Sequence, residues 1–282
     1  MATAQIQLFE RGARPMGFFT DTSLCIGCKA CEVACKQWNQ LPADGFSFSG
    51  MSYDNTRALG SETWRHVAFV EELGAGGAGA QTAWLMMSDV CKHCQHPGCL
   101  QACPTGAIVR TEFNSVYIQQ DVCNGCGYCV PSCPYGVVEM SPIDHQAHKC
   151  TLCYDRLRIG QEPACAKACP TDSIVFGYLD DLQARAQHRV EELHARGVTA
   201  ARLYGLDEGA AKDSDGSGTL GAFFLLLDEP QSYNLPARVR LPQHDVAKSW
   251  LSSLLTALLL SIATALALRN RRGAEGAEHT AS

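Results

Sequence analysis

Apolar and polar residues alternate along two neighbouring segments early in the chain, residues 64–73 (WRHVAFVEEL) and 81–90 (QTAWLMMSDV). This alternation predicts two β-strands that each bury one face. The glycine-rich residues 74–80 (GAGGAGA) between them predict a flexible hairpin loop. Apolar runs at 174–179 and 221–230 predict two further short strands.

Residues 180–197 (DDLQARAQHRVEELHARG) have a helical pattern instead. Two aspartates begin the segment and a glycine ends it, as expected at the two ends of a helix. Apolar side chains recur every three or four positions and predict a buried stripe of Leu182, Ala186, Val190 and Leu193.

Residues 250–268 (WLSSLLTALLLSIATALAL) contain no charge and are long enough to cross a bilayer, which needs about 17–25 residues. Because the segment lies near the end of the chain between basic residues, a membrane span is favoured over a buried core helix. Basic residues flank it on both sides and leave its orientation open. A stripe of small residues, Ser253, Ala257, Ser261 and Ala265, predicts a face that packs on another membrane helix.

The composition describes a folded protein with an unusual number of cysteines. Of the 282 residues, 46% are apolar and 18% are charged, which excludes disorder as the main state. The net charge of −6 argues against a nucleic-acid-binding surface. Residues 1–16 contain no apolar stretch of the kind found in secretory signals. The 16 cysteines are too sparse for a small disulfide scaffold and are expected to be ligands.

The cysteines form four groups of four along the sequence, which we call quartets. Quartets one and three have the spacing C-x2-C-x2-C-x3-C of bacterial ferredoxins, and quartets two and four lengthen the gap before their third cysteine. The quartets are Cys25, Cys28, Cys31 and Cys35; Cys91, Cys94, Cys99 and Cys103; Cys123, Cys126, Cys129 and Cys133; and Cys150, Cys153, Cys165 and Cys169.

This spacing favours [4Fe–4S] clusters over the two alternatives. Structural zinc sites usually combine two C-x2-C pairs separated by about 15–20 residues, whereas quartets one and three place three cysteines within one short loop. Cysteines three residues apart rarely form disulfides, and one spacing repeated in four places is not a bridge pattern. In two-cluster ferredoxins the fourth cysteine ligates the neighbouring cluster, but spacing alone does not say which quartets exchange it here.

The residues around the quartets predict electron transfer without a reaction on this chain. The sequence shows no catalytic triad, no open metal site with an adjacent base and no nucleotide-binding loop, so we expect no catalytic site. Several basic residues near the quartets are expected to offset cluster charge: Lys29, Lys92, Lys149, Arg156, Arg158 and Lys167. His93 and His96, within quartet two, are not needed as ligands.

The cysteine segments resemble a known family. The segments SLCIGCKACEVACKQWN (23–39) and KCTLCYDRLRIGQEPACAKACPTDSI (149–174) are similar to the iron–sulfur β subunits of membrane-bound formate dehydrogenases. More broadly, the chain resembles the four-cluster subunits of molybdopterin oxidoreductases. The resemblance runs from about residue 17 to the C-terminal apolar segment and is loose between residues 200 and 245.

The resemblance implies an α+β fold of two pseudo-symmetric ferredoxin-like halves with inserted β-hairpins and one C-terminal transmembrane helix. It also implies four [4Fe–4S] clusters with crossed ligands. The implied ligand sets are Cys25, Cys28, Cys31 and Cys169; Cys35, Cys150, Cys153 and Cys165; Cys91, Cys94, Cys99 and Cys133; and Cys103, Cys123, Cys126 and Cys129.

The family also implies a division of the chain. The expected parts are an N-terminal extension (1–16), a first ferredoxin-like half made of quartets one and four (17–90 and 141–180), a second half made of quartets two and three (91–140), a helix and docking segment (181–245), the transmembrane helix (246–269) and a tail (270–282).

The partners are implied in the same way. A molybdenum- or tungsten-pterin catalytic subunit would oxidise formate, and an integral membrane cytochrome b or quinone-reactive subunit would accept the electrons. The resemblance places the chain in the bacterial cytoplasmic membrane as a single-pass protein with its globular part on the periplasmic side, exported with its partner. The same subunit of a membrane hydrogenase, or of a sulfur-compound or dimethyl sulfoxide reductase, is the alternative.

Overall fold

The computed structural model describes residues 14–43, 45–46, 56, 58–72, 83–206, 216–241 and 245–279. The chain divides into two compact units, Met1–Leu241 and Pro242–Ser282. The first unit mixes helices and strands and contains every cysteine. In the second unit the described residues consist mainly of one long helix.

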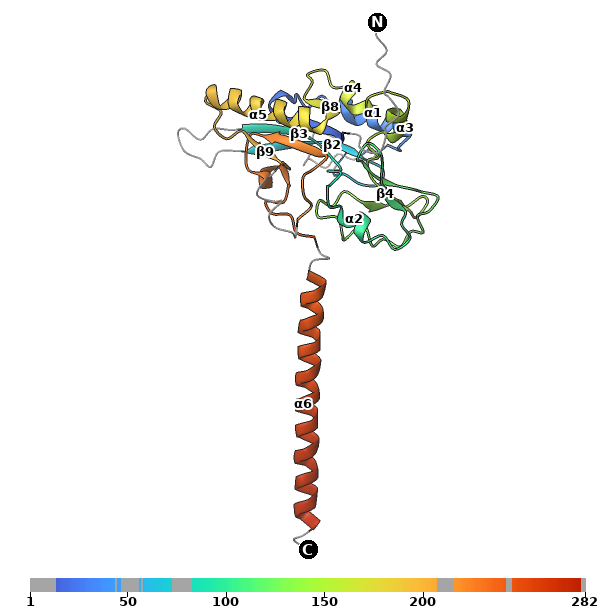
Figure 1. Ribbon diagram of the computed structural model, residues 1–282, viewed down its shortest axis with the longest axis vertical. Helices are drawn as coiled ribbons and strands as arrows, with labels where there is room; N and C mark the ends of the chain where they lie inside the picture. The colour runs from blue at the N-terminus through green and yellow to red at the C-terminus, as the bar shows by residue number, and fades with distance from the viewer. Residues whose placement is uncertain are drawn as a thin grey trace. The chain divides into compact units, whose positions relative to one another are not determined.

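A four-stranded sheet forms the centre of the first unit (Figure 1). Its order is β8 (Ile174–Tyr178), β1 (Met16–Asp21), β10 (Ala222–Leu226) and β9 (Arg202–Tyr204). Strands β1 and β10 run parallel and the other pairs are antiparallel. In this sheet β1, which precedes quartet one, pairs with β8, which follows quartet four. On its other side β1 pairs with β10, which lies more than 40 residues beyond β8.

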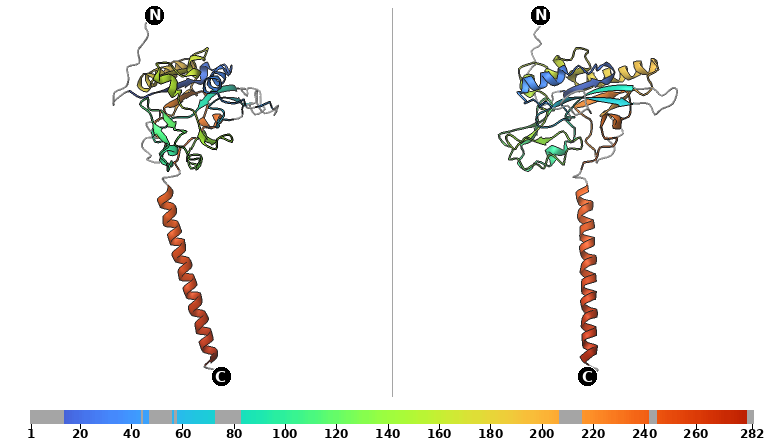
Figure 2. Two further views of the ribbon diagram at one scale, coloured as in Figure 1. Left: turned by 90° about the vertical axis from the view of Figure 1, so that its right-hand side faces the viewer. Right: turned by 180° about the vertical axis from the view of Figure 1, so that it is seen from behind.

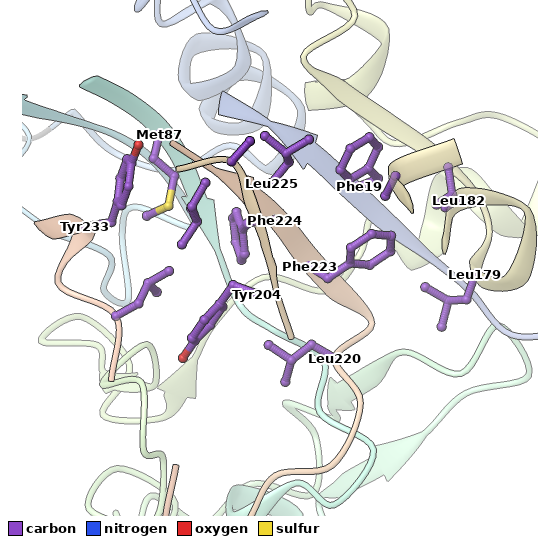
Figure 3. Packing of buried hydrophobic residues seen from close by; sticks show 14 of the residues in the cluster. Phe19, Met87, Leu179, Leu182, Tyr204, Leu220, Phe223, Phe224, Leu225 and Tyr233 are labelled. Carbon is purple, nitrogen blue, oxygen red and sulfur yellow. The ribbon is translucent and has the colours of Figure 1, made fainter. Parts of the chain in front are cut away.

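The two faces of the sheet cover different parts of the molecule. On one face, α5 (Leu179–Ala195) packs against Phe19 and Phe223, whose ring centroids lie 5.3 Å apart (Figure 3). On the other face, the neighbouring Phe18 packs in a cluster that includes cysteines of all four quartets. Because successive side chains of a strand point to opposite faces, β1 separates a helix-covered core from the cysteine-rich core.

The structure confirms most of the elements predicted for the second half of this unit. Strand β8 and helix α5 lie where the pattern predicts them, and Leu182, Ala186 and Leu193 are buried, with Val190 partly buried. Strand β10 is shorter than the predicted 221–230. It ends at Leu226, and a 3₁₀ turn, η2 (Pro230–Tyr233), begins at the proline, which cannot donate to a strand ladder.

The two strands predicted around residues 64–90 are also confirmed. β2 (Arg65–Glu72) pairs antiparallel with β3 (Ala83–Val90), in continuous register from Arg65 opposite Val90 to Glu72 opposite Ala83. The glycine-rich loop predicted at 74–80 lies outside the described residues.

Short elements hold the cysteine loops. Helices α1 and α4 pack side by side (Figures 1 and 2). The short elements are η1 (Thr22–Leu24), α1 (Ala30–Asn39), α2 (Gly98–Gln101), β4 (Ile108–Arg110), β5 (Val116–Ile118), β6 (Glu139–Met140), β7 (Ala147–His148), α3 (Tyr154–Arg158) and α4 (Ala164–Lys167).

Helix α6 (Val246–His279) contains the apolar segment predicted to span a membrane. Its stretch Ser249–Leu268 is long and apolar enough to cross a bilayer, and none of it is buried against described residues. The helix continues past residue 269, the expected end of the membrane span, into the charged residues that follow.

Gly17 in β1 tests how closely the central sheet is packed. A Cβ atom there would lie 2.0 Å from the carbonyl oxygen of Gly221, which accepts a 2.8 Å hydrogen bond from the amide of Phe18. We expect Gly17→Ala to destabilise the fold by about 1–3 kcal/mol, or about 2–4 °C in melting temperature for each kcal/mol. Thermal unfolding followed by circular dichroism measures the change.

Gly177, which pairs with Gly17 in the sheet, provides the matched control. Its Cβ would meet Leu182 at 3.7 Å, an ordinary contact, so we expect Gly177→Ala to leave the melting temperature nearly unchanged. Equal melting temperatures for the two variants would contradict this description of the sheet.

Candidate metal centres

Cys25 and Cys28 of quartet one lie on a tightly curved loop between η1 and α1, and Cys31 lies in the first turn of α1. Gly27 and Lys29 have φ values of +66° and +61°, so the backbone turns through the left-handed region at both positions. A hollow of about 290 Å³ opens beside this loop. Its lining includes three cysteines of quartet one and one of quartet four: Cys25, Cys28, Cys31 and Cys169, which we call sulfur set 1.

A second hollow, of about 320 Å³, lies beside quartet two. Its lining includes three cysteines of that quartet and the last cysteine of quartet three: Cys91, Cys94, Cys99 and Cys133, which we call sulfur set 3. The similar lining of the two hollows, four cysteines in each, indicates that they suit the same kind of group.

The packing of α1 against α4 brings the last cysteine of quartet one to quartet four. Burial raises the pKa of Cys35 well above its ordinary value, and the next largest causes are the neighbouring thiolates of Cys150, Cys165 and Cys153. These four residues form sulfur set 2. All four are buried.

The same reasoning defines a fourth group around quartet three. Burial raises the pKa of Cys129 to about 11, with smaller contributions from the thiolates of Cys123, Cys126 and Cys103. These four residues form sulfur set 4. In every set, three sulfurs belong to one quartet and the fourth belongs to another.

The donor groups fit iron–sulfur clusters. All sixteen cysteines are free thiols, so none is used in a disulfide. Among the described residues, no three Cys, His, Asp or Glu side chains converge as the ligands of a single metal ion. A cubane has four separate irons, so its thiolates lie further apart than the four ligands of one zinc ion, each about 2.3 Å from the metal.

The burial of the sulfurs supports the same conclusion. Burial raises the pKa of Cys99 and of Cys153 to about 12. Without a bound cation these thiols would stay protonated at neutral pH, and the negative charge of a thiolate would be costly in such a site. Iron replaces the proton and supplies the positive charge that buried thiolates require.

Backbone N–H groups point at several sulfurs. Leu152, at a φ of +60°, donates its amide hydrogen to Cys150 Sγ over 3.4 Å. Backbone amides also donate to Cys25 from Gly27 and to Cys153 from Ala164. Hydrogen bonds to cluster sulfurs help to set the reduction potential, so the loop geometry acts on function as well as on binding.

The four sets form one series. The thiolate of Cys165 in set 2 adds to the effect of burial on the pKa of Cys31 in set 1. In the same way Cys91 of set 3 acts on Cys150 of set 2, and Cys129 of set 4 acts on Cys99 of set 3. Cysteines of sets 1, 2 and 3 also pack in one apolar cluster, and cysteines of sets 3 and 4 pack in another, which is consistent with the order 1, 2, 3, 4.

Solvent exposure follows this order. One cysteine of set 1, Cys28, and one of set 4, Cys126, are exposed. All four cysteines of set 2 are buried, and in set 3 only Cys133 is partly exposed. The series thus has two accessible ends and a dry middle.

The six basic residues expected near the quartets differ in burial. Lys92, Lys149 and Arg156 are buried, and Arg158 and Lys167 are exposed. Lys29 is half-buried and pairs with Glu32 over 2.9 Å. His93 is buried and its Nδ1 accepts a hydrogen bond from the amide of Val116, whereas His96 is exposed.

The sequence reasoning missed Arg65. It is 1% exposed, and its Nη2 lies 3.3 Å from Cys165 Sγ. The pattern of residues 64–73 held a signal that could have identified it, since an arginine at this position shares a strand face with the apolar residues Val67 and Phe69.

Comparison with known proteins agrees with this geometry. Two models of the 4Fe–4S dicluster domain match the chain, one over residues 24–107 and the other over 82–179. Together they cover all sixteen cysteines.

Curated relatives extend the match. The chain is 41% identical to the formate dehydrogenase iron–sulfur subunit of Haemophilus influenzae over 76% of its length and 66% of the relative's. It is 39% identical to the nitrate-inducible formate dehydrogenase iron–sulfur subunit of Escherichia coli, over 76% of this chain and 69% of the relative. The B subunit of the anaerobic dimethyl sulfoxide reductase of E. coli is 34% identical over 60% of this protein and 76% of the relative.

The chain spans about two thirds of the length of the formate dehydrogenase relatives it matches. Its sixteen cysteines and two dicluster domains correspond to four [4Fe–4S] clusters. The chain belongs to the family of iron–sulfur electron-transfer subunits that includes those of the formate dehydrogenases.

Proposed function

We propose that this chain is the electron-transfer subunit of a membrane-bound formate dehydrogenase. The observation that carries the proposal is the packing of the sixteen cysteines into adjoining sulfur sets, of which sets 1 and 4 each contain an exposed cysteine. Such a series has an entry, an exit and protected intermediate stations, as a path for electrons requires. The similarity to formate dehydrogenase iron–sulfur subunits supports formate as the source of the electrons.

We infer that each sulfur set holds one cluster, so that the ligands are crossed between quartets. The two hollows and the mutual effects of the thiolates support this assignment. The inferred ligands are Cys25, Cys28, Cys31 and Cys169 for cluster 1; Cys35, Cys150, Cys153 and Cys165 for cluster 2; Cys91, Cys94, Cys99 and Cys133 for cluster 3; and Cys103, Cys123, Cys126 and Cys129 for cluster 4.

When bound, the clusters supply one-electron redox chemistry, and the chain's own residues set the conditions for it. Electron transfer slows steeply with distance, so the loops must hold neighbouring clusters close together. Burial excludes water from the middle of the series, and N–H donors adjust the sulfurs of individual sets. We assign no catalytic residue to this chain, since the conversion of formate to carbon dioxide, a proton and two electrons belongs to the partner.

The local structure also supports two pseudo-symmetric ferredoxin-like halves, one from 17–90 and 141–180 and the other from 91–140. Helices α2 and α4 each follow a proline cap, contain the third cysteine of their quartet and end at an alanine cap before the fourth. Gly27 and Gly125 occupy the same place in quartets one and three, with φ values of +66° and +73°. In this scheme the hairpin β2–β3 is an insertion within the first half.

The expected partners follow from the same family membership. A molybdopterin-containing catalytic subunit would deliver electrons to one accessible end of the series, and an integral membrane cytochrome b or quinone-reactive subunit would take them from the other. Helix α6 would cross the membrane once, and its small-residue stripe offers a face for the membrane subunit. We infer a periplasmic position for the globular unit from the family resemblance.

A second candidate is the electron-transfer subunit of a dimethyl sulfoxide reductase. The similarity to the B subunit of that enzyme, which covers 76% of the relative, favours it specifically. The lower identity and the smaller part of this protein that matches place it second. In that complex, electrons would leave the series at the catalytic subunit instead of entering there.

The substrate test uses the complex purified from its host under argon. If the proposal is correct, formate added to the oxidised complex bleaches the broad visible absorption of the clusters, and dimethyl sulfoxide does not restore it. The opposite result, no bleaching with formate and reoxidation of dithionite-reduced clusters by dimethyl sulfoxide, would support the second candidate and reject the first.

Crossed ligation is tested with Cys35→Ser. Because Cys35 lies among Cys150, Cys153 and Cys165, we expect the variant to lose or alter cluster 2. The electron paramagnetic resonance spectrum of the reduced variant should match that of Cys153→Ser, a reference for damage to cluster 2. A spectrum that matches Cys28→Ser, the reference for cluster 1, would contradict crossed ligation.

The membrane anchor is tested by deleting residues 246–282, which removes α6. We expect this chain and its catalytic partner to move from the membrane to the soluble fraction with the iron content per chain unchanged, because every cysteine lies in the first unit. A deletion of residues 273–282 alone should leave the complex in the membrane. Loss of iron from the longer deletion would show that the helix is needed for the fold of the first unit.

A further inference from the structure

Two buried cations lie between neighbouring sulfur sets. Arg65 is 1% exposed and Lys149 is 3% exposed. In the part of the chain that the structure describes, neither forms an ion pair with a carboxylate. Lys92 differs, because it is equally buried but is paired with Asp89.

Arg65 extends from β2 to the boundary of sets 1 and 2. Its Nη2 donates to Cys165 Sγ of set 2 over 3.3 Å, and its Nη1 donates to the carbonyl oxygen of Ser88 over 3.3 Å. The hydroxyl of Ser88 lies 3.2 Å from Cys31 Sγ of set 1. The guanidinium also lies 4.7 Å from the centre of the Phe18 ring, which closes the site on the side of the sheet.

Lys149 occupies the corresponding place between sets 2 and 3. Its Nζ donates to the carbonyl oxygens of Val116 and Cys150, the latter over 3.1 Å. Lys149 lines the hollow of set 3, and the thiolates that act on it are Cys91, Cys99 and Cys133 of set 3 and Cys150 of set 2.

The electrostatics of both cations depends on the clusters. A buried charge is costly unless an opposite charge compensates it. The Arg65 guanidinium donates to Cys165 Sγ, so a sulfur of set 2 is in direct contact with its charge. Lys149 donates to the backbone carbonyl of Cys150 in set 2 and lines the hollow of set 3, so its charge lies beside sulfurs of both sets. The clusters and their thiolates are thus the counter-charges of both side chains.

We propose that Arg65 and Lys149 are fixed charges that raise the reduction potentials of the clusters on either side of them, Arg65 for clusters 1 and 2 and Lys149 for clusters 2 and 3. Reduction adds one electron to a cluster, taken from its neighbour in the series, and no proton is needed. A nearby cation therefore favours the reduced form over the oxidised form. Cluster 2 adjoins both cations, so its reduction potential is raised the most. The inference rests on the proposed cluster assignment.

The test compares single variants of the complex in its host membranes by redox titration followed by electron paramagnetic resonance. We expect Arg65→Gln to lower the potentials of clusters 1 and 2 and Lys149→Gln those of clusters 2 and 3, with cluster 4 unchanged. The expected size is about a tenfold fall in the ratio of reduced to oxidised cluster at a fixed potential, which is 59 mV for one electron. Arg65→Lys keeps the positive charge, so the potentials of its clusters should stay close to those of the parent.

The control removes a surface cation that lines neither hollow. Arg202→Gln deletes a charge paired with Glu229, so we expect the four potentials to remain near those of the parent. Ser88→Asp offers a second route to the effect of Arg65→Gln. It places a carboxylate beside the guanidinium, which neutralises Arg65 without removing it.

The outcomes separate this inference from the proposed function. If the parent complex lacks four irons for each of four clusters, the cluster assignment itself fails. If the parent is complete, unchanged potentials in Arg65→Gln and Lys149→Gln, or an equal shift of all four clusters, overturn the inference. Loss of iron in every charge-removing variant, with Arg65→Lys intact, would assign the cations to assembly and also overturn it.

Discussion

The structure depends on bringing four thiolates together around each cluster when the sequence supplies only three from one loop. The fourth sulfur of each set comes from another quartet, as Cys35 does for set 2 and Cys169 for set 1. The fold must therefore hold quartet one against quartet four, although more than 100 residues separate them in the sequence. The packing of α1 on α4 and the pairing of β1 with β8 provide this closure.

The central sheet takes part both in holding the quartets together and in setting the electrostatic surroundings of the sulfurs. β1 directs Phe19 into the core under α5 and Phe18 toward the cysteines, where its ring lies against the Arg65 guanidinium. The apolar sheet face keeps the middle of the series dry, and this raises the strength of every charge interaction within it. In a low dielectric, a thiolate without a bound cation is unfavourable, so the thiolates require iron. The same low dielectric gives the two buried cations an effect on the cluster potentials. Packing and redox function thus depend on the same buried surface.

Much of this molecule could be predicted from its sequence, because the residues that carry the chemistry are also distinctive by spacing. The quartets identify the cofactors, and the strands at 64–73 and 81–90, the helix at 180–197 and the apolar C-terminal segment are found where their patterns predict them. Strand β10 ends earlier than predicted because the apolar run stops at Leu227 and the charged Asp228 and Glu229 follow before the turn at Pro230. Arg65 could not be placed near a cluster from local pattern, since Cys165, to which its guanidinium donates, lies 100 residues after it. The exchange of cysteines between quartets is likewise a property of tertiary closure, and spacing left it open.

The central claim is that each cluster lies within one crossed sulfur set and that the four follow one another in the order 1, 2, 3, 4. X-ray diffraction at the iron absorption edge from crystals of the purified complex tests this claim most directly. The account predicts four anomalous peaks in this protein, the first among Cys25, Cys28, Cys31 and Cys169 and the others in sets 2, 3 and 4 in turn. A peak enclosed by all four cysteines of one sequence quartet, or peaks at the zinc edge in place of the iron edge, would contradict it.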